Sequence, residues 1–154
     1  DIDGGAVAFL QKKLNLDADG ISDLLNKKSG VLGITELSSD MREVEAACEK
    51  GEPKAVLAMK MYNYRIKKYI GAYAAAMGGV DIIVFTAGVG ENQWSTRQES
   101  CEGLEFLGVE IDKELNKGLR GVEKVISTAN SKVTVCVIPT DEELMIATDT
   151  MNLL

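Results

Sequence analysis

The chain has 154 residues, a formal net charge of −7, 45% hydrophobic residues and no histidine. This length and composition suit one soluble domain with its own core, and the acidic balance argues against nucleic-acid binding, which depends on clustered Lys and Arg. Ser-His-Asp triads and histidine-based zinc sites are excluded, and no apolar run is long enough for a membrane span.

The first third of the chain is predicted to be helical, with one short extended segment. A first helix follows Asp3, whose carboxylate is a suitable N-cap. A second helix covers residues 21–28 and ends at Gly30. Residues 31–35 are then predicted to be extended.

Two further helices are predicted in the middle of the chain. Asp40 is expected to cap a helix that begins at Met41, and Glu43 completes a capping box with it. The longest helix begins at Pro53, where the missing N–H costs nothing, and ends before 78–79, a pair of glycines. Its apolar stripe is attributed to core packing and consists of Val56, Met59, Tyr62, Ile66, Tyr69, Tyr73 and Met77.

The second half of the chain mixes strands with helices, a pattern typical of the α/β class. The predicted strands are 80–86, 109–111, 123–127 and 132–138, and the predicted helices are 93–107, 112–119 and a last one from Thr140. The three cysteines have no CxxC spacing, which favours reduced, packed side chains in a cytoplasmic protein; they are Cys48, Cys101 and Cys136.

A glycine-rich segment follows the strand over 80–86 and consists of Gly88, Val89, Gly90, Glu91 and Asn92. A glycine lets the backbone approach a ligand closely, and a helix that follows can offer N–H groups to a phosphate. The segment is neither a GxGxxG nor a Walker motif. Taken by itself, it favours nucleotide binding and a plain tight turn equally.

Two more junctions between elements could hold a ligand, because ligands in open α/β sheets bind where strands end. After the strand over 132–138, Thr140 and Glu143 are expected to form a capping box. Glu142 is not needed for that box, and its carboxylate is a natural Mg²⁺ ligand, directly or through water. The other junction is the helix start at 39–42, for which a solvated surface is the simpler interpretation.

Five motifs, in order along essentially the whole chain, resemble those of acetate kinases, a family related to propionate and butyrate kinases. The motifs are KSGVLG (28–33), SSDMR (38–42), YIGAY (69–73), FTAGVGEN (85–92) and IPTDEEL (138–144). The resemblance implies the two-domain actin-like ATPase (ribonuclease H-like) fold, with a mixed sheet flanked by helices. It also implies reversible, Mg²⁺-dependent transfer of the terminal phosphoryl group of ATP to acetate, which gives acetyl phosphate and ADP.

By the same resemblance, particular residues are expected at the ATP and metal sites. The metal residue is Glu142, and Asp141 beside it stands where many members have asparagine. The residues expected around ATP are Asp40, Met41, Arg42, Gly88, Val89, Gly90, Glu91 and Asn92.

The resemblance further implies that residues 1–154 are the C-terminal, nucleotide-binding part of the kinase, truncated at its N-terminal side. The catalytic arginines, an aspartate, a histidine and the acetate pocket are expected upstream, so the fragment alone is predicted to be inactive. The last helix, about 141–154, can pack toward the N-terminal domain, and a homodimer is expected. The alternatives are a propionate kinase and a nucleotide-binding module that does not catalyse transfer.

Overall fold

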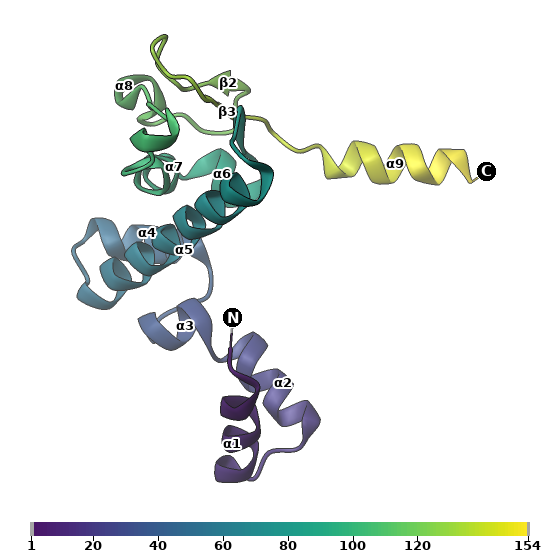
Figure 1. Ribbon diagram of the computed structural model, residues 1–154. Helices are drawn as coiled ribbons and strands as arrows, with labels where there is room; N and C mark the ends of the chain where they lie inside the picture. The colour runs from purple at the N-terminus through teal and green to yellow at the C-terminus, as the bar shows by residue number, and fades with distance from the viewer. Residues whose placement is uncertain (1, 154) are drawn as a thin grey trace. The chain divides into compact units, whose positions relative to one another are not determined.

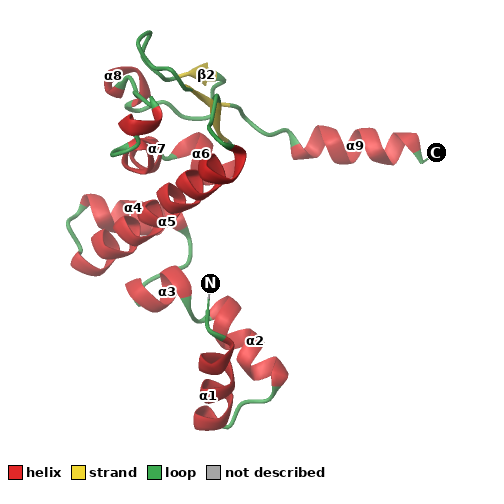
Figure 2. Ribbon diagram, viewed as in Figure 1, coloured by secondary structure: helices red, strands yellow, loops and turns green. Residues whose placement is uncertain are grey.

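The computed structural model describes residues 2–153 (Figure 1). The chain forms two compact units, the first ending at Tyr62 and the second beginning at Asn63. The first unit is helical, and strands occur only in the second within the described range (Figure 2). The first unit contains α1 (Gly4–Leu14), α2 (Ala18–Lys27), α3 (Gly30–Thr35), α4 (Met41–Glu49) and the beginning of α5 (Pro53–Met77).

The helix α3 corrects the extended segment predicted at 31–35. Gly30 has a φ of 61°, so the chain reverses directly after α2 and starts a new helix. The Ser29 hydroxyl donates to the Leu24 carbonyl at 2.7 Å, which fixes this reversal. A short apolar run does not distinguish a strand from a helix by periodicity, which is why the prediction was wrong.

Aspartate caps begin several of these helices, as predicted for α1 and α4. The Asp3 carboxylate accepts from the Gly5 amide at 2.6 Å, and the Asp40 carboxylate accepts from the Arg42 amide at 2.9 Å. The expected partner of the Asp40 amide was Glu43, but this amide donates instead to the Ser38 hydroxyl at 3.0 Å. The helix start is therefore as predicted, although the reciprocal half of the capping box is not.

The helix α5 has the predicted bounds, but its buried face differs from the predicted stripe. Tyr69, Tyr73 and Met77 are 42%, 63% and 67% exposed. Met59 is buried as predicted, but the other buried side chains along α5 are smaller or polar, namely Ala55, Ala58, Asn63 and Ala74. Small side chains let a helix approach its neighbours closely, whereas tyrosine keeps its hydroxyl in water. In the first unit, α4 and α5 meet in a core of Val44, Ala47, Ala55 and Met59.

The second unit contains a mixed, three-stranded sheet with the order β1-β3-β2. The strand β1 (Ile82–Phe85) pairs in parallel with β3 (Thr134–Val137), and β2 (Lys124–Val125) pairs antiparallel with β3. The remaining predicted strand, 109–111, is present only as an isolated bridge between Ile111 and Ser127. The predicted mixed α/β sheet is thereby confirmed.

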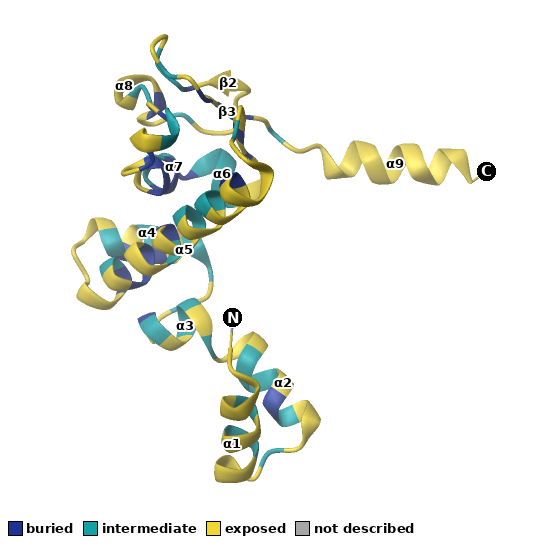
Figure 3. Ribbon diagram, in the orientation of Figure 1, coloured by how far each residue is buried: buried dark blue, intermediate teal, exposed yellow. Residues whose placement is uncertain are grey.

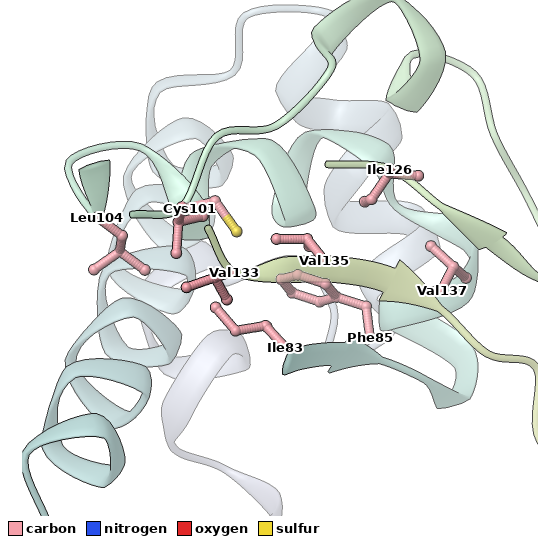
Figure 4. Packing of buried hydrophobic residues seen from close by; sticks show 9 residues of the cluster. Ile83, Phe85, Cys101, Leu104, Ile126, Val133, Val135 and Val137 are labelled. Carbon is pink, nitrogen blue, oxygen red and sulfur yellow. The ribbon is translucent and has the colours of Figure 1, made fainter. Parts of the chain in front are cut away.

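The helices of the second unit after α5 are short, apart from the last. They are α6 (Ala87–Asn92), α7 (Trp94–Cys101), the 3₁₀ helix η1 (Glu105–Leu107), α8 (Lys113–Asn116) and α9 (Glu142–Asn152). The single helix predicted over 93–107 is broken at Gly103, whose φ is 80°. The core around the sheet includes the side chains of Figure 4, among them Phe85, Cys101 and Val135. Burial raises the pKa of the Cys101 thiol to about 12, as expected for a packed, unreactive cysteine.

The last helix differs from the others in its burial. Every described residue of α9 is exposed (Figure 3), so its predicted packing toward another domain stays a prediction. Within residues 2–153, no helix combines the length and the apolar character that crossing a bilayer requires.

Candidate functional site

The glycine-rich segment at 88–92 lies in the helix α6 and is not the tight turn that its sequence suggested. The turn is formed one residue earlier by Ala87, whose φ is 57°, and Gly88 and Gly90 have ordinary helical backbone. The two glycines have different surroundings. A Cβ on Gly90 would lie 3.1 Å from the Phe85 carbonyl carbon, whereas a Cβ on Gly88 would have nothing within 4 Å. Gly90 thus lets α6 pack on β1, and Gly88 leaves open space.

Alanine substitutions are expected to separate these two roles. Gly90→Ala should lower the free energy of unfolding by about 1–3 kcal/mol, because the methyl group overpacks against the backbone of β1. Gly88→Ala should leave stability unchanged or slightly raised, because alanine favours the helix. Thermal melts of both variants check this. If Gly88→Ala instead weakens nucleotide binding without lowering the melting temperature, the open space at Gly88 is where the nucleotide approaches.

The polar side chains of α6 are engaged with the protein itself. The Asn92 side-chain amide donates to the Gly88 carbonyl at 2.9 Å, which closes the helix. Glu91 Oε1 accepts from both the amide and the hydroxyl of Thr140, at 2.8 and 3.0 Å. These bonds lower the pKa of the Glu91 carboxyl, mainly through the Thr140 backbone N–H. Of the predicted ATP residues in this segment, Gly88 is the most open and Val89 is half-buried.

Thr140 therefore does not cap α9, contrary to the prediction. The N-cap is Asp141, whose carboxylate accepts from the Leu144 amide at 2.9 Å. Aspartate and asparagine are equally good N-caps. Asp141 therefore caps α9 as well as the asparagine that the family resemblance leads us to expect at this position. The cap leaves Glu142 and Glu143 as exposed carboxylates in the first turn of α9.

An open cavity of about 340 Å³ joins the two predicted ligand segments of the second unit. It is lined by Ala87, Gly88, Glu91, Thr140, Asp141, Glu142 and Glu143. This adjacency follows from the topology. Because β1 and β3 are parallel neighbours, the segments that leave their carboxyl ends emerge at the same edge of the sheet. The structure thus brings Gly88 and Glu142, which are distant in sequence, into one site.

The donor set of this cavity fits Mg²⁺ held together with phosphate, and it does not fit an all-protein metal cage. Among residues 2–153, no cluster of three or more Asp, Glu, Cys or His side chains converges on a point where a metal could be held. Mg²⁺ commonly keeps several waters and uses one or two carboxylates plus substrate phosphates. Glu142 could supply such a carboxylate, because capping α9 falls to Asp141 and holding Thr140 falls to Glu91.

Asp40, Met41 and Arg42 lie at the start of α4. They belong to the first unit, whereas α6 belongs to the second. The guanidinium group of Arg42 donates to the Asp40 carboxylate, with Nη2 2.6 Å from Oδ2. This side-chain bond, with the backbone bond to the same residue, lowers the pKa of the Asp40 carboxyl to about 2. Met41 is half-buried and the Arg42 side chain is 89% exposed. Their joint action with 88–92 stays a prediction.

A buried arginine that was not among the predicted site residues donates hydrogen bonds to backbone carbonyls of α6. Arg97 is fully buried, and its Nη1 donates to the carbonyls of Gly90 and Glu91 at 2.7 and 3.0 Å. Its Nη2 donates to the Leu119 carbonyl at 2.7 Å, and its Nε donates to Asn116 Oδ1 at 2.8 Å. One signal in the sequence could have indicated that Arg97 is buried. It lies four residues before Cys101 and therefore on the apolar face of the predicted helix.

Comparison with known proteins gives one consistent family. The acetokinase family model matches residues 1–148. The acetate kinase of Phocaeicola vulgatus is 69% identical over 154 residues, which are 100% of this chain and 38% of that protein. The crystal structure of Porphyromonas gingivalis acetate kinase superposes with a TM-score of 0.92 and 60% identity, covering 99% of this chain and 38% of that chain.

A propionate kinase from Francisella tularensis is also similar, with a TM-score of 0.87 and 37% identity over 100% of this chain and 39% of that one. The chain thus spans about 38% of the length of the relatives named first. The helix-rich α/β architecture with a small mixed sheet is consistent with the predicted actin-like ATPase fold. The five motifs, the family match and the structure agree, and the chain belongs to the acetokinase family.

Proposed function

We propose that these residues form the nucleotide- and Mg²⁺-binding part of an acetate kinase, which transfers the γ-phosphoryl group of ATP to acetate and gives acetyl phosphate and ADP, reversibly. The observation that carries the proposal is the cavity shared by Gly88 and Glu142, at the edge where β1 and β3 both end. In this proposal the residues are the C-terminal part of a cytoplasmic enzyme that binds neither nucleic acid nor membranes.

The chemistry of phosphoryl transfer fits such a site, because catalysis rests on positioning and on neutralising the charge of the transferring group. Gly88 leaves room for the nucleotide to approach the backbone of α6. Met41 and Val89 are apolar enough to flank a purine, and Arg42 can reach hydroxyl or phosphate groups. When bound, Mg²⁺ would neutralise phosphate charge, and Glu142 would hold it directly or through water.

The main alternative within the family is a kinase that acts on propionate, because a propionate kinase is 37% identical over the whole chain. The test is to assay the full-length protein for acyl phosphate formation from ATP with acetate and with propionate. A higher kcat/KM for acetate supports the proposal, and a higher value for propionate replaces it. A protein that binds ATP but forms neither acyl phosphate is a nucleotide-binding module.

The isolated 154 residues are expected to show no phosphoryl transfer. The proposal assigns the acetate pocket and the catalytic arginines to residues outside this segment, so the fragment would hold the nucleotide without an acceptor. A coupled assay for acetyl phosphate on the purified fragment, compared with the full-length protein, checks this. Transfer by a fragment preparation free of full-length enzyme would contradict the division of roles.

A homodimer is expected, with α5 at the interface. Tyr73 and Met77 are 63% and 67% exposed on α5. Exposed apolar surface on a long helix favours association. Light scattering should therefore give a dimer for the full-length protein and a monomer for the double variant Tyr73→Glu, Met77→Glu.

The matched control for the dimer is Phe106→Glu in η1, because Phe106 is 78% exposed and lies outside α5. This variant should remain a dimer. A monomeric wild type, or a double variant that still dimerises, would contradict the assignment of the interface.

A further inference from the structure

The segment that carries Glu142 has little packing to hold it. The Ile138 amide donates to the Phe85 carbonyl at 3.0 Å, at the point where the chain leaves the sheet after β3. From Thr140 to the end of α9, every described residue is exposed. Within residues 2–153, burial therefore does not determine where the first turn of α9 lies relative to α6, and the contacts that this part of the chain supplies are polar ones.

Two hydrogen bonds from one carboxylate join this segment to α6. Glu91 Oε1 accepts from the Thr140 amide at 2.8 Å and from the Thr140 hydroxyl at 3.0 Å, across a sequence separation of 49 residues. Hydrogen bonds to an ionised acceptor are stronger than those between neutral groups. Thr140 directly precedes Asp141, the N-cap, so that fixing Thr140 fixes the start of the helix.

Glu91 is itself anchored in the protein interior. Its carbonyl oxygen accepts from the Gly121 amide at 3.1 Å and from Nη1 of the buried Arg97 at 3.0 Å. The anchoring therefore runs from buried Arg97 through the backbone of Glu91 to its side chain, and from there to Thr140. This is the arrangement expected of a residue that transmits position from the core to an exposed segment.

We propose, on the basis of the function proposed above, that Glu91 acts in the ATP site as a positioning residue, which holds Thr140 and thereby keeps Glu142 beside Gly88. In this role Glu91 binds neither the nucleotide nor the metal directly. Both hydrogen bonds from Thr140 go to Oε1 of Glu91, so the protein itself holds this carboxylate.

The test is a double-mutant cycle on the Mg²⁺ dependence of phosphoryl transfer by the full-length protein. Glu91→Ala should raise the Mg²⁺ concentration for half-maximal rate about tenfold, as expected when bonds to a charged acceptor are lost. Thr140→Val, which keeps the backbone N–H, should raise it less. The double variant should match Glu91→Ala, because both changes remove the same contact. The KM for acetate should not change.

The conservative variant separates positioning from direct binding. Glu91→Gln keeps an acceptor oxygen for Thr140 but loses the charge, so it should retain most of the wild-type Mg²⁺ dependence. If Glu91→Gln is as impaired as Glu91→Ala while Thr140→Val has no effect, Glu91 binds the metal or nucleotide directly and the inference is overturned.

A second measurement does not depend on activity. In the full-length protein without nucleotide, hydrogen exchange of the Thr140 amide should be about tenfold or more faster in Glu91→Ala than in wild type. Equal exchange rates would overturn the contact. A wild-type protein without Mg²⁺-dependent transfer would overturn the proposed function, whereas an active wild type whose Mg²⁺ dependence is unchanged by Glu91→Ala would overturn the positioning role alone.

Discussion

Replacing Glu142 by glutamine in the full-length protein is expected to lower the turnover number about 10- to 100-fold, the usual cost of disturbing a residue that orients a metal ion. The Mg²⁺ concentration needed for half-maximal rate should rise in parallel. The physical reason is that Glu142 is a free carboxylate in the cavity that also contains Gly88. The melting temperature should change little, because the Glu142 side chain is exposed.

Two neighbours of Glu142 serve as controls. Asp141→Ala should mainly destabilise α9, by about 1 kcal/mol, because it removes the N-cap bond to Leu144. Glu143→Gln should be nearly silent in stability, because the capping role first assigned to Glu143 with Thr140 does not exist in the structure. A magnesium titration of all three variants distinguishes the roles. Near-normal turnover and magnesium dependence in Glu142→Gln would show that this carboxylate only favours the helix dipole.

The elements were predictable from the sequence where local signals decide them. The bounds of α5 follow from a proline at its start and glycines after its end, and α4 begins at the aspartate that caps it. The antiparallel pair of β2 and β3 matches the two strands predicted over 123–127 and 132–138, which a short polar turn connects. These features depend on residues close in sequence, so that one chain read alone is enough to find them.

The start of α9 could not be predicted, because a distant residue decides it. Thr140 and Asp141 are both competent N-caps. Glu91, far back in the sequence, takes both the amide and the hydroxyl of Thr140, and the cap moves one residue on to Asp141. The turn before α6 also differs from the tight turn that the glycines at 88 and 90 suggested. Ala87 takes the left-handed conformation, and Gly90 packs against Phe85.

Arg97 was missed for a related reason, since the partners that justify its burial are backbone carbonyls and leave no trace in the sequence. A charged side chain is rarely fully buried unless it is paired. Here pairing comes from the Gly90, Glu91 and Leu119 carbonyls and from the Asn116 side chain. Burial lowers the pKa of the Arg97 guanidinium, yet these acceptors surround it with partial negative charge.

Removing Arg97 is expected to cost more stability than replacing Gly90 or Asp141. Arg97→Ala leaves the carbonyls of Gly90 and Leu119 and the Oδ1 of Asn116 without the Arg97 donor, whereas the Glu91 carbonyl keeps the Gly121 amide. Each unsatisfied group costs about 1–3 kcal/mol, so that a total loss of about 4 kcal/mol or more is expected. Arg97→Met fills most of the volume but donates nothing, so it should lose nearly as much. Arg97→Lys keeps the charge without the planar fork of donors and should recover only part of the loss.

Urea denaturation of the full-length protein measures these differences, with Lys117→Ala as the matched control. Lys117 is an exposed cation one residue after α8, so its removal should change the free energy of unfolding by no more than about 0.5 kcal/mol. If Arg97→Met were as stable as Lys117→Ala, volume alone would account for the site and the hydrogen bonds to α6 would contribute nothing. If Met and Ala are both strongly destabilised while Lys is intermediate, the donors of Arg97 are what hold α6 and, through Glu91, the segment that carries Glu142.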